Sequence, residues 1–212
     1  MTATVVEHYF DYKSPYAYLA QAASWRLGAE PGVTLEWRPY TLQIPKYLGA
    51  AELAADGSDT VGTRNDHQWR RVRYAYMDCR REANRRGLTI RGPRKIFDSV
   101  PAHVAFLWVN EQGERRRFHD AVFERFWRRE LDIEDAAVLT ALMRELGYAD
   151  AGFEAYLEGP GRARHDAIQA QAEAVGVFGV PSWRVGEELF WGLERLPRVY
   201  ELLGRPVPPE ET

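Results

Sequence analysis

The feature that most constrains the fold is a short strand followed at once by a turn and a helix. Residues 5–10 form a β-branched and aromatic run of the length that a buried strand needs. Asp11 ends this run, Ser14 supplies an N-cap hydroxyl, and Pro15 suits the first helical position. Apolar residues then recur at helical spacing up to Gly28. Taken alone, Ser14 and Pro15 indicate no more than a well-capped helix.

The other end of the chain has an equally ordered pattern. Residues 166–175 predict a helix that Gly176 ends. Two strands, over residues 182–185 and 188–191, are joined by a two-residue loop that begins with glycine, as in a hairpin. A last helix is expected over residues 194–203. With a second strand over residues 33–37, the two ends give β-α-β and then α-β-β-α.

Three motifs carry a resemblance to a known family. Phe10 to Tyr18 reads Phe-Asp-Tyr-Lys-Ser-Pro-Tyr-Ala-Tyr, residues 176–181 read Gly-Val-Phe-Gly-Val-Pro, and residues 190–195 read Phe-Trp-Gly-Leu-Glu-Arg. In these motifs and in the order of its elements, the chain resembles the 2-hydroxychromene-2-carboxylate isomerases and kappa-class glutathione transferases. These families belong to the DsbA-like branch of the thioredoxin superfamily. The motifs cover only the two ends, about a third of the chain.

The resemblance implies an α/β, thioredoxin-like (DsbA-like) fold with a large all-helical insertion. We expect residues 1–45 and 163–212 to form the thioredoxin-like domain and residues 46–162 to form the insertion. Periodicity predicts helices in the insertion over residues 65–86, 101–110, 114–129 and 133–146, the last capped by Asp132. Loops are expected at residues 56–59 and 159–161, and the proline-rich residues 205–210 predict a frayed tail.

The resemblance also implies a site for glutathione or another low-molecular-weight thiol. A thiolate beside Ser14 is favoured by the hydroxyl proton and by the positive end of the helix dipole, which together lower the pKa of a thiol from about 8.5. A cis Pro181 leaves the backbone of Val180 to pair with an extended ligand; the alternative is an ordinary trans proline at the start of a strand. Glu194 either meets the ammonium group of the ligand or stabilises its own helix start.

Other expected ligand residues depart from the family pattern. Asn65 lies where relatives carry a Gly-Asn-x-Pro-Pro segment, which is not visible here, and Leu193 and Glu194 stand where relatives have a polar residue and Asp. Tyr16, Tyr74 and Asp98 are expected to line an aromatic-substrate pocket between the lobes. For the tyrosines the alternative is the core. For Asp98 and His103 it is a loop acid and a histidine on a helix surface.

The function implied is a thiol-dependent isomerase or transferase acting on an aromatic-pathway intermediate. Disulfide-forming relatives carry Cys-x-x-Cys before the first helix, where this chain has Ser-Pro-Tyr-Ala, so protein disulfide exchange is disfavoured. A DsbA-like oxidoreductase with a degenerate active site stays an alternative. So does a protein that binds a thiol or a peptide without chemistry, or a polyanion through its arginine-rich helix.

Composition sets the remaining expectations. The net charge of −3 gives no bulk attraction to nucleic acid or to an anionic membrane, and no apolar segment approaches the roughly 18 residues of a membrane span. Histidines and the lone Cys79 lack metal-ligand spacing, so no metal is expected. One cysteine and the absence of a signal-like N-terminus favour the cytoplasm. The family resemblance alone implies a homodimer.

Overall fold

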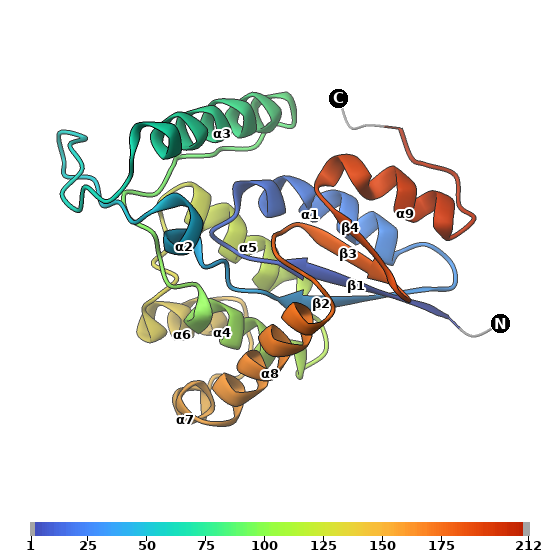
Figure 1. Ribbon diagram of the computed structural model, residues 1–212. Helices are drawn as coiled ribbons and strands as arrows, with labels where there is room; N and C mark the ends of the chain where they lie inside the picture. The colour runs from blue at the N-terminus through green and yellow to red at the C-terminus, as the bar shows by residue number, and fades with distance from the viewer. Residues whose placement is uncertain (1–2, 210–212) are drawn as a thin grey trace.

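The computed structural model describes residues 3–209 and is built on one mixed sheet. Its strand order is β2-β1-β3-β4, with β1 (Thr4–Phe10) parallel to β2 (Val33–Pro39) and antiparallel to β3 (Ser182–Val185) (Figure 1). β4 (Glu188–Trp191) returns along β3 through the turn at residues 186 and 187. The expected strands and hairpin are therefore present, and the hairpin strands have the expected bounds.

His8 shows how the inner strand is tied to its neighbours. Its ring is fully buried and stacks on Trp183 of β3 with the centroids 4.8 Å apart. Nδ1 lies 3.1 Å from the carbonyl oxygen of Ser182, and Nε2 lies 3.1 Å from Oγ of Ser24. Burial lowers the pKa of His8 to about 3. The neutral ring therefore links β1, β3 and the first helix without a buried charge.

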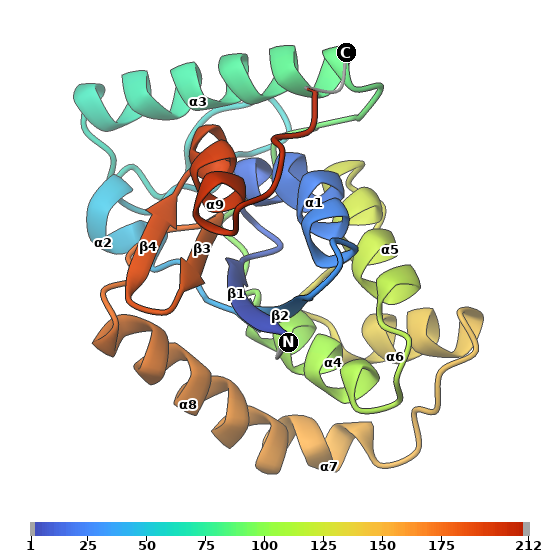
Figure 2. The ribbon, with the colours of Figure 1, turned by 90° about the vertical axis from the view of Figure 1, so that its right-hand side faces the viewer.

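Helices cover both faces of the sheet. α1 (Pro15–Gly28) and α9 (Leu196–Leu202) lie on one face, and α4 (Val100–Asn110) and α8 (Pro160–Ala174) lie on the other (Figure 2). α5 (Arg116–Trp127) packs against both α1 and α4. The main core forms where these helices meet β1, because α4 and α5 supply large apolar side chains such as Phe106 and Phe123.

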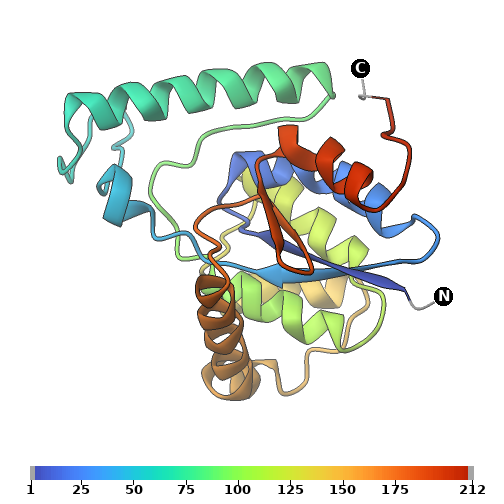
Figure 3. The ribbon, with the colours of Figure 1, turned by 45° about the vertical axis from the view of Figure 1, so that its right-hand side comes forward.

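The middle of the chain is helical but less regular than expected. Besides α4 and α5, its helices are α2, α3, α6 and α7, over Ile44–Leu48, Asp66–Arg85, Ala136–Glu145 and Phe153–Glu158. Residues 49–65 and 86–99 are irregular apart from two isolated β-bridges, so the prediction of an almost wholly helical segment is only partly right. α3 stands beyond α1 and α9, away from the sheet (Figure 3), and of its residues only Cys79 and Ala83 are buried.

Two helix starts differ from the sequence prediction. Asp135, not Asp132, caps α6, because its Oδ1 accepts the N–H groups of residues 137 and 138 at 2.8 and 3.2 Å. Asp132 instead caps a tight turn just before, accepting the N–H of Glu134. The predicted loop at 159–161 is wrong in part: Pro160 occupies the first turn of α8, six residues before the expected helix start, and α8 crosses the predicted domain boundary at residue 162.

The described part of the C-terminal tail, residues 205–209, lies beside α9 and the first helix. The N–H of Arg205 donates to the carbonyl of Tyr200 at 2.9 Å, which closes the end of α9. Residues 207–209 then pack over a groove that is described below. Residues 205–209 form no helix or strand, and that the tail is frayed stays a prediction; Glu210 lies outside the described residues.

A search of the helices within residues 3–209 finds none with both the length and the apolar character needed to cross a membrane.

We predict that Gly161→Ala destabilises the fold, although alanine has the higher helix propensity. A Cβ at this position would lie 2.3 Å from the ring of Tyr156 and 2.6 Å from Cγ1 of Val104, so α8 must move away from α7 and α4. The expected loss is about 1–3 kcal/mol of unfolding free energy, measured by urea denaturation. Ala167→Gly, at an exposed position of α8, is the control and should lose only about 1 kcal/mol of helix propensity. A stabilised Gly161→Ala would contradict the packing.

Candidate active site

Ser14 stands where β1 passes into α1. Its backbone is extended (φ −91°, ψ 115°), and its Oγ accepts the N–H of Ala17 at 3.2 Å. Its carbonyl accepts the N–H of Tyr18, and Pro15 has no N–H, so the remaining backbone donor of this first turn is that of Tyr16. Ser14 is 4% exposed. The expected N-cap is present, and its hydroxyl lies at the positive end of α1.

The loop that leads into β3 lies at the same end of the two central strands, β1 and β3, as Ser14. Tyr9 pairs with Ser182 in the antiparallel ladder, so the end of β1 and the start of β3 are neighbours although the chain separates them by more than 170 residues. The Val180–Pro181 peptide bond is cis, as the resemblance implies. The carbonyl of Pro181 accepts the N–H of Gly192 at 2.9 Å, which brings the turn before α9 to this edge as well.

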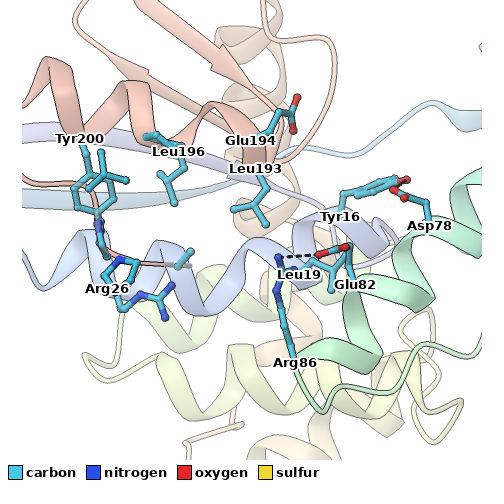
Figure 4. Close-up of a pocket in the computed structure, with 15 residues that line it drawn as sticks. Tyr16, Leu19, Arg26, Asp78, Glu82, Arg86, Leu193, Glu194, Leu196 and Tyr200 are labelled. Carbon is cyan, nitrogen blue, oxygen red and sulfur yellow. Dashed lines mark hydrogen bonds and ion pairs between the residues drawn. The ribbon is translucent and has the colours of Figure 1, made fainter. Parts of the chain in front are cut away.

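A groove of about 370 Å³ runs along α1 from Tyr16 towards Arg26. The exposed side of α1 forms its floor, the polar side of α3 forms one wall, η1 (Leu193–Arg195) with α9 forms the other, and the tail closes it (Figure 4). Its lining comprises Tyr16, Leu19, Ala23, Arg26, Asp78, Glu82, Arg86, Leu193, Glu194, Leu196, Pro197, Tyr200, Val207, Pro208 and Pro209.

The two walls of the groove differ in chemistry. Leu193 and Leu196 present apolar surface, whereas α3 presents carboxylates and a guanidinium, with Arg86 paired to Glu82 at 3.4 Å. The phenol of Tyr16 donates to Asp78 at 3.1 Å. Burial and this hydrogen bond raise the pKa of Tyr16, so the phenol keeps its proton at neutral pH. The groove is therefore amphipathic, with an apolar wall facing a polar one.

A buried polar chain lies beneath the Ser14 loop. Nε2 of His103 is 3.4 Å from Oδ1 of Asp11, and Nδ1 of the same ring is 3.0 Å from Oγ1 of Thr41. Oγ1 of Thr41 is also 3.0 Å from Nε2 of His165, whose Nδ1 is 3.2 Å from Asp166. All but Asp166 are buried. His103 therefore pairs with Asp11 and not with Asp98, and the prediction of a histidine on a helix surface is wrong.

The residues expected around the site do not all meet. Glu194 and Tyr16 line the groove, whereas Ser14, Val180 and Pro181 lie outside its described lining at the adjoining sheet edge.

Three others lie elsewhere. Asn65 caps α3, where its side chain accepts the N–H of Gln68 at 2.9 Å in a reciprocal capping box. Tyr74 is 60% exposed on α3 and belongs neither to the core nor to the groove. Asp98 accepts the N–H of Val100 at the start of α4.

An aromatic pair beside the cis peptide was not singled out from the sequence. The rings of Phe178 and Trp191 are 4.9 Å apart, and both side chains are more than half exposed. A Cβ on Gly179 would lie 2.7 Å from Nε1 of Trp191, so a larger residue here would displace the half-exposed indole. The signal was available, because both aromatic residues lie within the quoted motifs. Within the described residues, no cluster of three His, Cys, Asp or Glu side chains is arranged to hold a metal.

Comparison with known proteins gives the family of the chain. Residues 5–204 match the family model of the DSBA-like thioredoxin domain. The chain belongs to this family. The predicted thioredoxin-like α/β fold with a helical insertion is thus confirmed, while the proposed domain bounds stay a prediction.

The chain is also similar to individual proteins over most of its length. The chain is 29% identical over 197 residues to a 2-hydroxychromene-2-carboxylate isomerase of Sphingobium xenophagum. The matched region covers 92% of this chain and 95% of that protein. A solved 2-hydroxychromene-2-carboxylate isomerase superposes with a TM-score of 0.72 at 23% identity over 94% of each chain. A probable DsbA oxidoreductase of Streptomyces coelicolor gives 0.73 at 19% identity, covering 98% of this chain and 93% of its own. The resemblance found in the motifs is confirmed.

The buried His165 predicts a pH dependence of stability. Burial and the neighbouring His103 lower its pKa to about 4, whereas an unfolded histidine titrates near 6.5. The folded state therefore binds fewer protons, and its stability declines as the pH falls from about 6.5 towards 4. Between pH 7 and pH 5 this histidine accounts for a loss of about 2 kcal/mol.

We expect His165→Gln to weaken this loss by that amount in urea denaturation series at the two pH values. His67→Gln, on the exposed surface of α3, is the matched control and should keep the dependence of the wild type. An unchanged dependence in His165→Gln would contradict the role of the buried ring.

Proposed function

We propose that this protein is an isomerase of the 2-hydroxychromene-2-carboxylate isomerase type that uses glutathione or another small thiol. The observation that carries the proposal is the N-cap hydroxyl of Ser14 at the start of α1, beside the cis-proline edge and the mouth of an amphipathic groove. Curated relatives that match over most of the chain bear the name of this isomerase. A location in the cytoplasm and a homodimer are part of the same proposal.

The donors at the start of α1 suit a thiolate. Ser14 Oγ accepts the N–H of Ala17, which leaves its own proton to be donated to a sulfur anion. The N–H of Tyr16 and the dipole of the fourteen-residue helix add positive potential at the same place. When bound, the thiol supplies a nucleophilic sulfur that adds to a conjugated double bond and leaves again, so that the bond rotates and the thiol is regenerated. No oxidant or reductant is consumed.

The rest of the site holds and orients the substrate. Leu19 and Leu193 enclose an aromatic ring, and the protonated phenol of Tyr16 can donate to a substrate oxygen in place of Asp78. Glu194, in the turn that Gly192 ties to Pro181, can meet the ammonium group of glutathione. The backbone of Val180, beside the cis peptide bond, can pair with the peptide part of that ligand. Asn65, fixed in its capping box, has no part in this arrangement.

We expect Ser14→Asn to lower thiol-dependent isomerisation by at least about a hundredfold, with little loss of stability. Asparagine keeps the N-cap but lacks the hydroxyl, so the variant separates catalysis from capping. Activity is measured with 2-hydroxychromene-2-carboxylate and glutathione, and glutathione binding by the thermal shift it causes.

Ser14→Thr keeps both functions and is the control. A panel of cysteine and other small thiols tests the identity of the sulfur donor. The proposal is wrong if no thiol shifts the wild type, and Ser14 has another role if the shift survives in Ser14→Asn.

A second prediction concerns the groove. Leu193→Trp fills the space between η1 and α1, so the KM for the aromatic substrate should rise at least about tenfold, because a bulky ligand ring loses its apolar contact. Tyr74→Ala removes an exposed ring outside the groove and should leave KM unchanged. If KM rises in Tyr74→Ala and not in Leu193→Trp, the substrate binds against the exposed side of α3 and not in the groove.

A further inference from the structure

A buried ion pair directly precedes Ser14. Nζ of Lys13 lies 3.6 Å from Oδ2 of Asp11, and the two side chains are 6% and 0% exposed. Lysine is almost never buried without a partner, because removing its ammonium from water has a large cost. The burial of the Lys13 ammonium therefore needs an explanation in the structure or function of the site. The helix start does not require it, since Ser14 already caps α1.

Asp11 is the residue that fixes the Ser14 loop. Its Oδ1 accepts the N–H of Lys13 at 3.1 Å, and its Oδ2 accepts the N–H of Leu42 at 2.8 Å. Its backbone carbonyl accepts the N–H of Ser14 at 3.0 Å, and Nε2 of His103 faces the carboxylate from α4. Asp11 thus joins the loop after β1, the loop after β2 and α4. Without it, the position of the N-cap has no lateral support.

The carboxylate that makes these contacts is charged. Burial opposes ionisation, yet Lys13 and His103 together hold the pKa of Asp11 well below its usual range. The field of this charge extends beyond its own loop, because burial and then the charge of Asp11 raise the pKa of Tyr47, on α2, to about 12. The fixed negative charge of Asp11, three residues before Ser14, opposes the formation of a thiolate at Ser14.

We infer that Lys13 is the counter-charge that lets Asp11 hold the Ser14 loop without raising the pKa of a thiol bound at Ser14. The inference rests on the proposed function. In it Asp11 is a positioning residue, and Lys13 acts on the bound sulfur through its charge. The other titratable groups facing the pair are His103 from α4, His165 behind Thr41 from α8, and Tyr47 from α2.

Charge compensation and loop support make different predictions. Lys13→Met removes the lysine counter-charge of the Asp11 carboxylate and leaves only His103 facing it, so the pKa of the bound thiol should rise by about one unit. Asp11→Asn leaves the ammonium alone, so that pKa should fall by about one unit. This is the scale expected for a unit charge about 10 Å away at an effective dielectric constant near 20. A merely structural role loosens the site in both variants, and both pKa values then move up towards that of the free thiol.

The experiment measures the thiolate of bound glutathione by its ultraviolet absorbance as a function of pH. It uses the wild type, Lys13→Met, Asp11→Asn, Lys13→Arg and the double variant Asp11→Asn/Lys13→Met. We expect opposite shifts in the first two variants. The pKa should stay close to the wild-type value in Lys13→Arg and in the double variant, where neither charge remains. If Lys13→Met fails to fold, the double variant can still be measured, because it lacks the Asp11 carboxylate whose charge Lys13 balances.

The outcomes separate this inference from the proposed function. If the wild type does not lower the pKa of glutathione, the thiol site itself is wrong. If the wild type lowers it and Ser14→Asn abolishes the effect, the site stands. In that case, shifts of the same sign in Lys13→Met and Asp11→Asn, or none in either, overturn the charge compensation alone. If only the double variant folds, a pKa more than about one unit from the wild-type value overturns it.

Discussion

The pairing of β1 with β3 is the interaction on which the rest of the molecule depends. It joins residues 7–9 to residues 182–184, so the sheet is completed by two strands that almost the whole length of the chain separates. The ladder places the start of α1, the cis Pro181 and the turn before α9 at one edge. Every group assigned to sulfur chemistry is positioned by this register, since a slip by one residue would turn the side chains of β3 to the opposite face.

The sequence predicted the two ends of the chain better than its middle. Short strands, a glycine turn and a capped helix are local patterns, and the hairpin of β3 and β4 was found with its bounds. The start of α8 was missed because Gly159, Pro160 and Gly161 read as a loop. Pro160 is allowed in a first helical turn, and Gly161 is selected by close packing against Tyr156, which no local pattern reveals. Asp132 and Asp135 were equally good caps by sequence.

The residues of the candidate site also fall into two groups: those that a local motif predicted, and those whose contacts are long-range. Ser14 and Pro181 were predicted because each belongs to a motif of several residues, and Glu194 came with them. The partner of His103 could not be predicted, because Asp11 lies more than ninety residues away and Asp98 lies five. Thr41 and His165 were not predicted for the same reason, because their hydrogen bonds join residues that are far apart in the sequence. Asn65 and Tyr74 were placed by their position in the chain. Asn65 caps α3, and Tyr74 is exposed on α3 outside the groove that Asp78 and Glu82 of the same helix line.

The proline-rich segment at residues 207–209 has a consequence for how such a pocket can diversify. Irregular surface segments tolerate changes of length and composition that a sheet does not. Because this segment forms one side of the groove, the shape of the groove can be altered by replacing a few residues that lie in no strand or helix. Selectivity for the organic substrate can therefore drift among homologues while the sulfur-handling edge stays the same.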